Sequence, residues 1–255
     1  MPVLPEYDLS GKTAILATSG GGEAPFLAQA LVEGGASVFA VARTQALLDA
    51  VLGSLPAGSS GAVMDANDPG SAKQVMERFD RAYGGQSSGK IDILVNDARS
   101  MYAQALEQIS VDEWDSVQTR NAKAPFLLSQ QVLPRMAKAE YGRVVNMISE
   151  LAERGMINGS AFAASQASVL ALTRSLAVEW SRFNIRINAI GTGWIDTQGQ
   201  TLEEQREELL VRYIPLRRKG SPGDIGPLLV YLCSESCDYS TGQPVYVDGG
   251  LNAHP

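Results

Sequence analysis

The apolar positions alternate along the chain between short continuous runs and longer segments with helical spacing. The run KTAILAT at 12–18 is followed by a glycine-rich turn and by the helical pattern APFLAQALVEGG, which ends on Gly34 and Gly35. An apolar run that leads through a turn into a helix is typical of a strand buried on both faces of a parallel sheet. The first 35 residues therefore predict a strand, a turn and a helix.

The same alternation continues to the end of the chain. We expect further strands at 36–43, 61–68, 90–97, 142–149, 185–193 and 242–250, and further helices at 44–55, 70–84, 110–139 and 160–183. This order predicts an α/β fold, a doubly wound parallel sheet with right-handed crossovers, in a single domain. The long insertion at about 194–228, before the last strand, is where we expect a substrate lid.

Composition narrows the possible partners and sites. The net charge is -7 and no lysine or arginine run occurs, which argues against nucleic acid and anionic membranes. No apolar run reaches the ~18 residues of a membrane span, so we expect a cytoplasmic protein. Cys233 and Cys237 predict buried free thiols and no metal site. The single histidine, His254, excludes a mechanism built on a central histidine.

Several segments in the second half resemble the short-chain dehydrogenase/reductase family, in the family's order. They are GRVVNMIS, VLALTRSLAVEW, IRINAIGTGWIDT and TGQPVYVDGG, and the likeness extends over nearly the whole chain. The resemblance implies a single Rossmann-type domain over residues 1–255, a nicotinamide cofactor across the carboxyl ends of the strands, and an Asn-Ser-Tyr-Lys catalytic set. It also implies dimers or tetramers formed through the two long central helices. A fold does not carry its function with it, so each position needs its own check.

The glycine-rich turn departs from the family's T-G-x-x-x-G-x-G. Gly22 is in register, but Thr18 and Ala24 replace the first and third glycines, which let the backbone approach the pyrophosphate. Glu23 lies where the family has an apolar residue. Its carboxylate suits a helix N-terminus and would repel a pyrophosphate there.

The remaining cofactor positions are mixed. Asp65 and Asn96 match the family's adenine-side aspartate and first turn asparagine. Ala42 lacks the carboxylate that holds the adenosine ribose in NAD-dependent members, and Arg43 either meets a 2′-phosphate or is simply solvated. Arg99 replaces a glycine and would fill space meant for ribose or nicotinamide.

The catalytic set keeps its first two members and loses the last two. Asn121 and Ser149 match the family, whereas its Y-x-x-x-K is here Phe162 to Gln166. Phenylalanine has no proton to give and glutamine has no charge. Thr192 departs from the family's proline beside the nicotinamide. These changes predict a vestigial site, with Asn121 and Ser149 serving to satisfy backbone groups.

We therefore expect no cofactor in this chain, and NAD in a partner. The leading hypothesis is a non-catalytic subunit that assembles with an active paralogue of the family in a hetero-oligomer, as a heterotetramer. The resemblance extends to such subunits of hydroxyacyl-CoA dehydrogenases of anaerobic toluene breakdown. The alternatives are an enzyme of non-redox chemistry, such as a dehydratase or isomerase, and a metabolite-binding sensor. The helices over 111–138 and 160–183 carry apolar faces that fit either association or packing on their own sheet.

Overall fold

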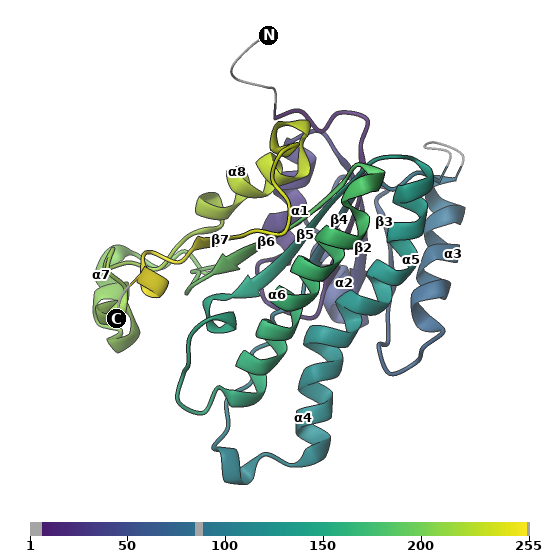
Figure 1. The fold of residues 1–255 in the computed structure, drawn as a ribbon. Coiled ribbons are helices and arrows are strands. Elements are labelled where there is room, and N and C mark those ends of the chain that lie inside the picture. Colours follow the sequence, from purple (N-terminus) through teal and green to yellow (C-terminus); the bar gives the residue numbers. More distant parts are fainter. Residues whose placement is uncertain (1–6, 85–88, 254–255) are drawn as a thin grey trace.

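The fold is built on one parallel sheet. The computed structural model describes residues 7–84 and 89–253, and His254 lies outside them. Seven strands follow the order β3-β2-β1-β4-β5-β6-β7 and all pair in parallel (Figure 1). The strands are β1 Thr13–Thr18, β2 Ser37–Ala42, β3 Ser60–Val63, β4 Ile93–Asp97, β5 Gly142–Ser149, β6 Ile185–Thr192 and β7 Pro244–Val247. The predicted doubly wound sheet is confirmed.

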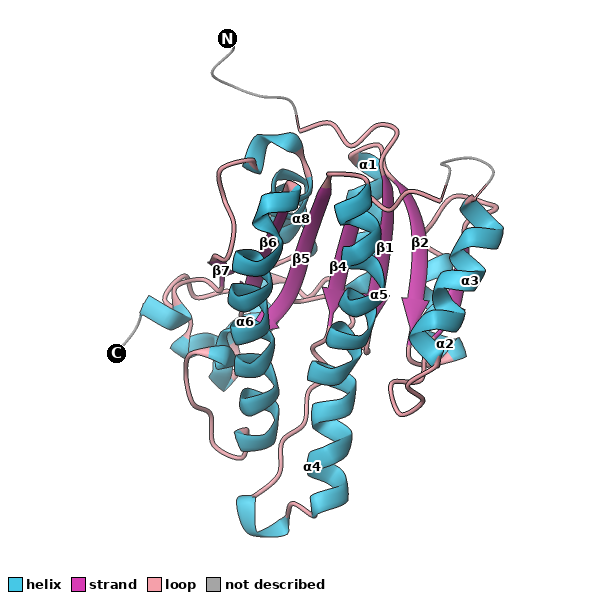
Figure 2. Cartoon of the chain, turned by 45° about the vertical axis from the view of Figure 1, so that its right-hand side comes forward, coloured by secondary structure: helices cyan, strands magenta, loops and turns pink. Residues whose placement is uncertain are grey.

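Helices cover both faces of the sheet. They are α1 Ala24–Glu33, α2 Gln45–Leu52, α3 Ser71–Tyr83, α4 Val111–Gln118, α5 Ala124–Lys138, α6 Ser160–Trp180, α7 Leu202–Arg206 and α8 Pro222–Cys233. Side chains from α1, α2 and α8 fill the core on one face, and those from α3, α5 and α6 fill the core on the other. In Figure 2 the arrowheads of the central strands point toward the end of the molecule where α4 extends beyond the sheet. That end is the carboxyl edge, where ligands of this architecture bind.

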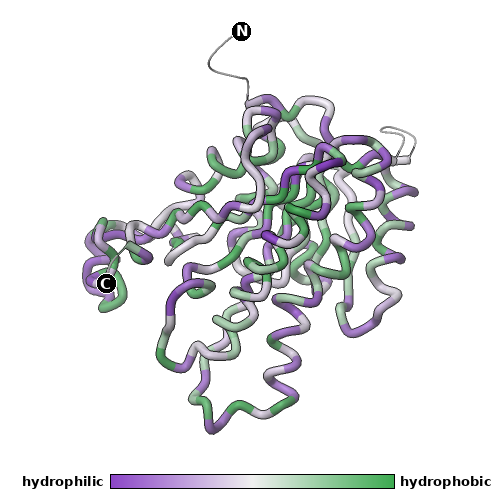
Figure 3. The backbone as a smooth tube through the Cα atoms, in the orientation of Figure 1, coloured by the Kyte–Doolittle hydropathy of each residue, from purple (hydrophilic) through white to green (hydrophobic). Residues whose placement is uncertain are grey.

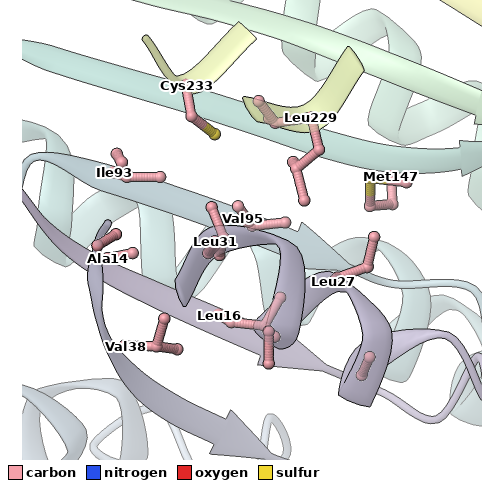
Figure 4. Packing of buried hydrophobic residues seen from close by; sticks show 14 of the residues in the cluster. Ala14, Leu16, Leu27, Leu31, Val38, Ile93, Val95, Met147, Leu229 and Cys233 are labelled. Carbon is pink, nitrogen blue, oxygen red and sulfur yellow. The ribbon is translucent and has the colours of Figure 1, made fainter. Parts of the chain in front are cut away.

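The core between the sheet and α1 shows why the apolar runs become strands. Leu27 and Leu31 of α1 pack against Leu16 and Val95 of neighbouring strands, with Leu229 of α8 beside them (Figure 4). All are nearly or fully buried. Hydrophobic colours accordingly run along the central strands in Figure 3. The thiols of Cys233 and Cys237 are free and buried, and burial raises the pKa of each.

The predicted helix over 110–139 is interrupted. It consists of α4, a π-helical segment at Thr119–Lys123 (η2), and α5. Asn121 lies in this segment, and its side-chain amide exchanges hydrogen bonds of 3.0 Å with the backbone N–H and C=O of Ser100. A π-helical turn at such a position is a common mark of a functional site.

The expected lid over 194–228 divides into two parts. Residues 194–221, with α7 and the 3-10 turn Leu209–Tyr213, lie outside the sheet layers. Residues 222–228 instead begin α8, whose Ile225 and Leu229 are fully buried against the sheet and α1. Pro222 is the first residue of α8, a common place for proline in a helix. The lid role of about 194–228 stays a prediction.

The long helices mostly bury their apolar faces within this chain. In α5, Leu127, Leu133 and Met136 are buried in the core, while Phe126 is 46% exposed. Helix α6 with its following turn is long and apolar enough to cross a membrane by length and composition, and it is the one such segment in the described residues. It packs on β5 and β6, and the core helix of an α/β fold meets the same criteria.

Candidate active site

The turn between β1 and α1 folds around carboxylates. Gly20 and Gly22 have φ of +114° and +87°, values that favour glycine. A Cβ on Gly21 would lie 2.9 Å from Glu23 Oε2 and 3.1 Å from Asp97 Oδ1. Carboxylate oxygens therefore fill the space over this turn.

A buried ion network crosses the carboxyl edge from β4 to β6. Arg99 Nε donates to Asp97 Oδ1 at 2.8 Å, and Arg99 Nη1 lies 3.4 Å from Glu23 Oε1. The same Nη1 donates to Thr192 Oγ1, and Thr18 Oγ1 donates to Asp97 Oδ2 at 3.0 Å. Relative exposures of the Arg99, Glu23 and Asp97 side chains are 5%, 11% and 0%. Side chains of this chain thus occupy the centre of the edge.

Burial and charge act in opposite directions on this network. Burial raises the pKa of Glu23, opposed by Arg99 and assisted by Asp97. For Arg99, burial favours a lower pKa, but attraction to Asp97 and then to Glu23 outweighs it and raises the pKa. Arg99 remains charged, and Glu23 Oε2 has no hydrogen-bond partner within the described chain. The sequence analysis placed Arg99 and Glu23 beside the expected cofactor, and the structure brings the two side chains together; it missed Asp97 as their partner.

Gln166 links two strand ends. Its Oε1 accepts from the backbone N–H of Ser149 at 2.9 Å, and its Nε2 donates to the backbone C=O of Ala98 at 2.9 Å. Phe162, one turn earlier on α6, is 2% exposed. The structure therefore brings Ser149, Phe162 and Gln166 together as the sequence predicts, with Gln166 fully buried and uncharged.

Glu150 is a carboxyl group that sequence reasoning missed. Ser149 Oγ donates to Glu150 Oε2 at 2.7 Å and accepts from the backbone N–H of Leu151 at 3.2 Å. Glu150 is 5% exposed, and burial raises its pKa above the usual range for glutamate. A signal was available, because a carboxyl group directly after a buried strand lies at the edge where ligands bind.

The two asparagines bond to protein groups, although Asn96 Oδ1 has no hydrogen-bond partner in the described chain. Asn121 is fully buried, and besides Ser100 it donates to Ser165 Oγ at 3.3 Å. Asn96 Nδ2 donates to Asn146 Oδ1 at 2.8 Å. The Asn121 contacts join η2 to α6 and to the segment after β4, and the Asn96 contact joins β4 to β5.

Beside the ion network lies an open pocket of about 500 Å³. Its lining comes from the ends of β1, β2 and β4, the segment after β3, and the α4 to α5 region. The residues are Ala17, Thr18, Ser19, Val41, Ala42, Arg43, Met64, Asp65, Ala66, Asn67, Asn96, Asp97, Ala98, Asp112, Asp115, Ser116, Thr119, Arg120, Ala124 and Pro125. Of the predicted cofactor residues, Thr18, Ala42, Arg43, Asp65 and Asn96 line it, whereas Gly22, Glu23, Ala24, Arg99 and Thr192 do not.

Metal chemistry has no evident ligand set in the part of the chain that the structure describes. No group of three or more histidine, cysteine, aspartate or glutamate side chains there could hold an ion. Three acidic side chains of the edge are engaged, Glu23 and Asp97 with Arg99 and Glu150 with Ser149.

Comparison with known proteins gives relatives over nearly the full chain. The model of the enoyl-(acyl carrier protein) reductase family matches residues 19–252. The 3-oxoacyl-(acyl-carrier-protein) reductase of Thermotoga maritima is 33% identical over 95% of this chain and 98% of the relative. The 2-dehydro-3-deoxy-D-gluconate 5-dehydrogenase of Bacillus subtilis is 32% identical over 96% of each chain.

Solved structures share the fold of this chain, and they too are named as dehydrogenases or reductases. A putative short-chain alcohol dehydrogenase from Sinorhizobium meliloti has a TM-score of 0.82 and 32% identity, covering 98% of this chain and 100% of the other. Levodione reductase has a TM-score of 0.80 and 27% identity, covering 96% and 99%.

These names correct the leading hypothesis. The prediction of a non-catalytic subunit is wrong, because the matched relatives are named oxidoreductases and nothing among them indicates such a subunit. The expected hetero-oligomer, its NAD-bound partner, the cytoplasmic location, and a role in toluene breakdown with acyl-CoA stay predictions. The chain belongs to the short-chain dehydrogenase/reductase family of oxidoreductases.

Proposed function

We propose that the chain is a nucleotide-binding oxidoreductase of this family, whose pocket holds the adenosine end of an adenine nucleotide. The observation that carries the proposal is the open pocket of about 500 Å³ at the carboxyl ends of β1, β2 and β4. This volume is within the range of small-ligand sites, and the place is the topological switch point of the sheet.

The pocket walls suit a flat base and a ribose. Val41, Met64 and Ala66 give apolar surface on which a purine ring packs. Asp65 is exposed at the rim, and its Oδ1 accepts from the backbone N–H and side-chain amide of Asn67 at 2.9 Å each. Its other oxygen is available to an amino or hydroxyl group of the ligand.

The second half of a dinucleotide does not fit the present arrangement of side chains. Glu23 and Asp97 occupy the turn that would hold the pyrophosphate, and Arg99 reaches across to Thr192. A negative charge about 4 Å from an ionised Glu23 costs about 4 kcal/mol at an effective dielectric constant of about 20. The proposal therefore includes no bound dinucleotide in this state of the chain, and no reaction step is derived through one.

Ser149 and Glu150 favour a second candidate function, the interconversion of a hydroxyl and a carbonyl group that the relatives' names suggest. Burial raises the pKa of Glu150, which favours the protonated form more than at an exposed glutamate. A carbonyl reduction would take its hydride from a reduced nicotinamide. Glu150, with Ser149 Oγ 2.7 Å away, would give the proton to the substrate oxygen, a task for which Phe162 has no group.

Calorimetric titration with adenosine, AMP, NADH and NADPH tests the first function. We expect adenosine and AMP to bind one per chain, and NADH to bind no more tightly than AMP. Asp65→Ala should weaken binding, whereas Asp68→Ala, an exposed carboxylate outside the pocket lining, should not. Absence of binding by all four ligands at millimolar concentration would overturn the proposal.

The second function is tested by reductase assays with NADH and NADPH on a 3-oxoacyl thioester and a 2-dehydro sugar acid. Any turnover should be lost in Glu150→Gln and kept in Glu153→Gln, the exposed control three residues away. Turnover that survives Glu150→Gln would exclude Glu150 as the proton donor.

A further inference from the structure

The buried ion network begins at the wall of the adenosine pocket. Thr18 and Asp97 line the pocket, and Thr18 Oγ1 donates to Asp97 Oδ2 at 3.0 Å. Asp97 in turn pairs with Arg99, and Arg99 pairs with Glu23. A phosphate chain that leaves the pocket toward the glycine turn would therefore meet this network.

The backbone of the turn has few donors left for an anion. A helix N-terminus usually offers several free N–H groups. Here four of them are bonded within the chain, those of Ser19, Gly20, Phe26 and Leu27. Pro25, in the first turn of α1, has no N–H. An anion at this turn would therefore depend on a side-chain donor, and Arg99 is the one cation that pairs with Glu23 or Asp97 among the described residues.

Glu23 lies where a bound anion would lie, and the protein holds its carboxylate weakly. The residue is 8% exposed, and its contact to Arg99 Nη1 is long, at 3.4 Å. Its Oε2 has no hydrogen-bond partner within the described chain and would be 2.9 Å from a Cβ on Gly21. Glu23 is the N-cap of α1, but its side chain makes no capping bond. A buried carboxylate with so few bonds gains little from its charge.

The charge of the network depends on one proton. Two carboxylates face a single guanidinium, so the network has one negative charge in excess when both are ionised and none when Glu23 is protonated. Asp97 accepts from Thr18 and Arg99, which favours its ionised form. Burial raises the pKa of Glu23, opposed by Arg99 and assisted by Asp97. Glu150 is the further charged group that acts on Arg99.

We propose that Glu23 is an internal substitute for a phosphate group: when ionised it holds Arg99 and keeps a pyrophosphate out of the glycine turn, and when neutral it releases Arg99 to bind one. This inference rests on the adenosine pocket of the proposed function. It identifies Glu23 as the residue that decides whether the chain accepts only a nucleoside or also a pyrophosphate. Arg99 suits this role because a guanidinium donates two parallel hydrogen bonds to phosphate oxygens.

The test compares ADP-ribose with adenosine. ADP-ribose carries a pyrophosphate and no nicotinamide ring, and adenosine is the uncharged reference. Calorimetric titrations at pH 8 and pH 5.5 use the wild-type chain, Glu23→Gln, the double variant Glu23→Gln with Arg99→Met, and Glu33→Gln. Glu33 is exposed at the other end of α1, about 15 Å along the helix, so its variant removes the same charge from the same helix.

The measured quantity is the preference for ADP-ribose, the ratio of the adenosine dissociation constant to that of ADP-ribose. In the wild-type chain we expect this ratio to rise about tenfold or more from pH 8 to pH 5.5, because protonation of Glu23 removes a repulsive charge. Glu23→Gln should have the high ratio at both pH values, and the double variant the low ratio at both. Glu33→Gln should follow the wild-type chain.

Proton uptake gives a second readout. Binding that requires a neutral Glu23 takes up a proton, at most about one per chain, when it occurs above the pKa of Glu23. Titrations of ADP-ribose at pH 7 in buffers of different ionisation enthalpy measure this uptake. We expect uptake by the wild-type chain and none by Glu23→Gln, which also separates Glu23 from Glu150 as the group that titrates.

The outcomes distinguish this inference from the function on which it rests. A wild-type ratio that does not change with pH, or a pH dependence that persists in Glu23→Gln, overturns the role of Glu23. A high ratio in the double variant overturns the role of Arg99. In these cases adenosine still binds and the proposed function stands, whereas both fail if neither ligand binds. Thermal denaturation checks folding, and the wild-type chain and Glu23→Gln decide the matter if the double variant does not fold.

Discussion

Replacing Arg99 with methionine tests the ion network at the carboxyl edge. The substitution keeps a long side chain and removes the guanidinium that pairs with Asp97 at 2.8 Å and with Glu23 at 3.4 Å. No other cation among the described residues forms an ion pair with either carboxylate. Both acids would then stay buried without compensation.

The expected cost follows from burial. Removing one partner of a buried ion pair destabilises a protein by about 3–5 kcal/mol. Thr18 still donates to Asp97, so we expect about 3 kcal/mol. The matched control is Arg135→Met, which breaks a pair with Asp80 at 2.6 Å whose side chains are 33% and 45% exposed. An exposed pair is worth about 0–1 kcal/mol.

Urea unfolding followed by circular dichroism at pH 7 and pH 5 measures both variants. Burial already raises the pKa of Glu23, and loss of Arg99 should raise it further. A carboxyl group whose folded pKa lies above its unfolded value stabilises less as pH rises. The loss in free energy of unfolding caused by Arg99→Met should therefore be larger at pH 7 than at pH 5. If Arg99→Met lowers the free energy of unfolding no more than Arg135→Met does, the argument that Arg99 stabilises the two buried carboxylates is wrong.

Three further predictions concern the same edge. The double variant Phe162→Tyr with Gln166→Lys should show no NAD-dependent turnover in a spectrophotometric assay, because the Glu23 network still fills the turn; measurable turnover would confine the defect to α6. Glu150→Gln should raise the melting temperature more at pH 8 than at pH 5, since a raised glutamate pKa destabilises above its ordinary value of 4.5; an equal change at both pH values would argue against that shift. Gly21→Ala should cost about 1–3 kcal/mol in urea unfolding, with less cost when Glu23 is also alanine; independent effects would contradict the 2.9 Å approach.

Most of the fold could be predicted from the sequence because each strand is a continuous apolar run. The strand predicted at 142–149 has those bounds, since every residue in it is buried. The break in the helix predicted at 110–139 was not accessible, because it depends on Asn121 bonding to the backbone of residue 100, far along the chain. Periodicity reports a local pattern, and this interruption is a tertiary effect.

The sequence predicted which residues lie at the candidate site, but not which of them contact one another. The spacing of Phe162 and Gln166 predicts that both side chains lie on one face of the helix, and the structure has both buried. The sequence could not show that Arg99 pairs with Asp97, or that Arg120 faces the same pocket as Arg43. Those relations exist only once the strand ends meet at one edge of the sheet.

The two hydrogen bonds of Gln166 limit which single substitutions the site tolerates. The amide both accepts from Ser149 and donates to Ala98, which one lysine could not do. Lysine at this position would leave a buried N–H without an acceptor, at about 1–3 kcal/mol, and would bring an ammonium group into a fully buried position. The single step from Gln166 to lysine thus passes through a less stable protein, so a return to a tyrosine and lysine pair depends on compensating changes around Ser149 and Ala98.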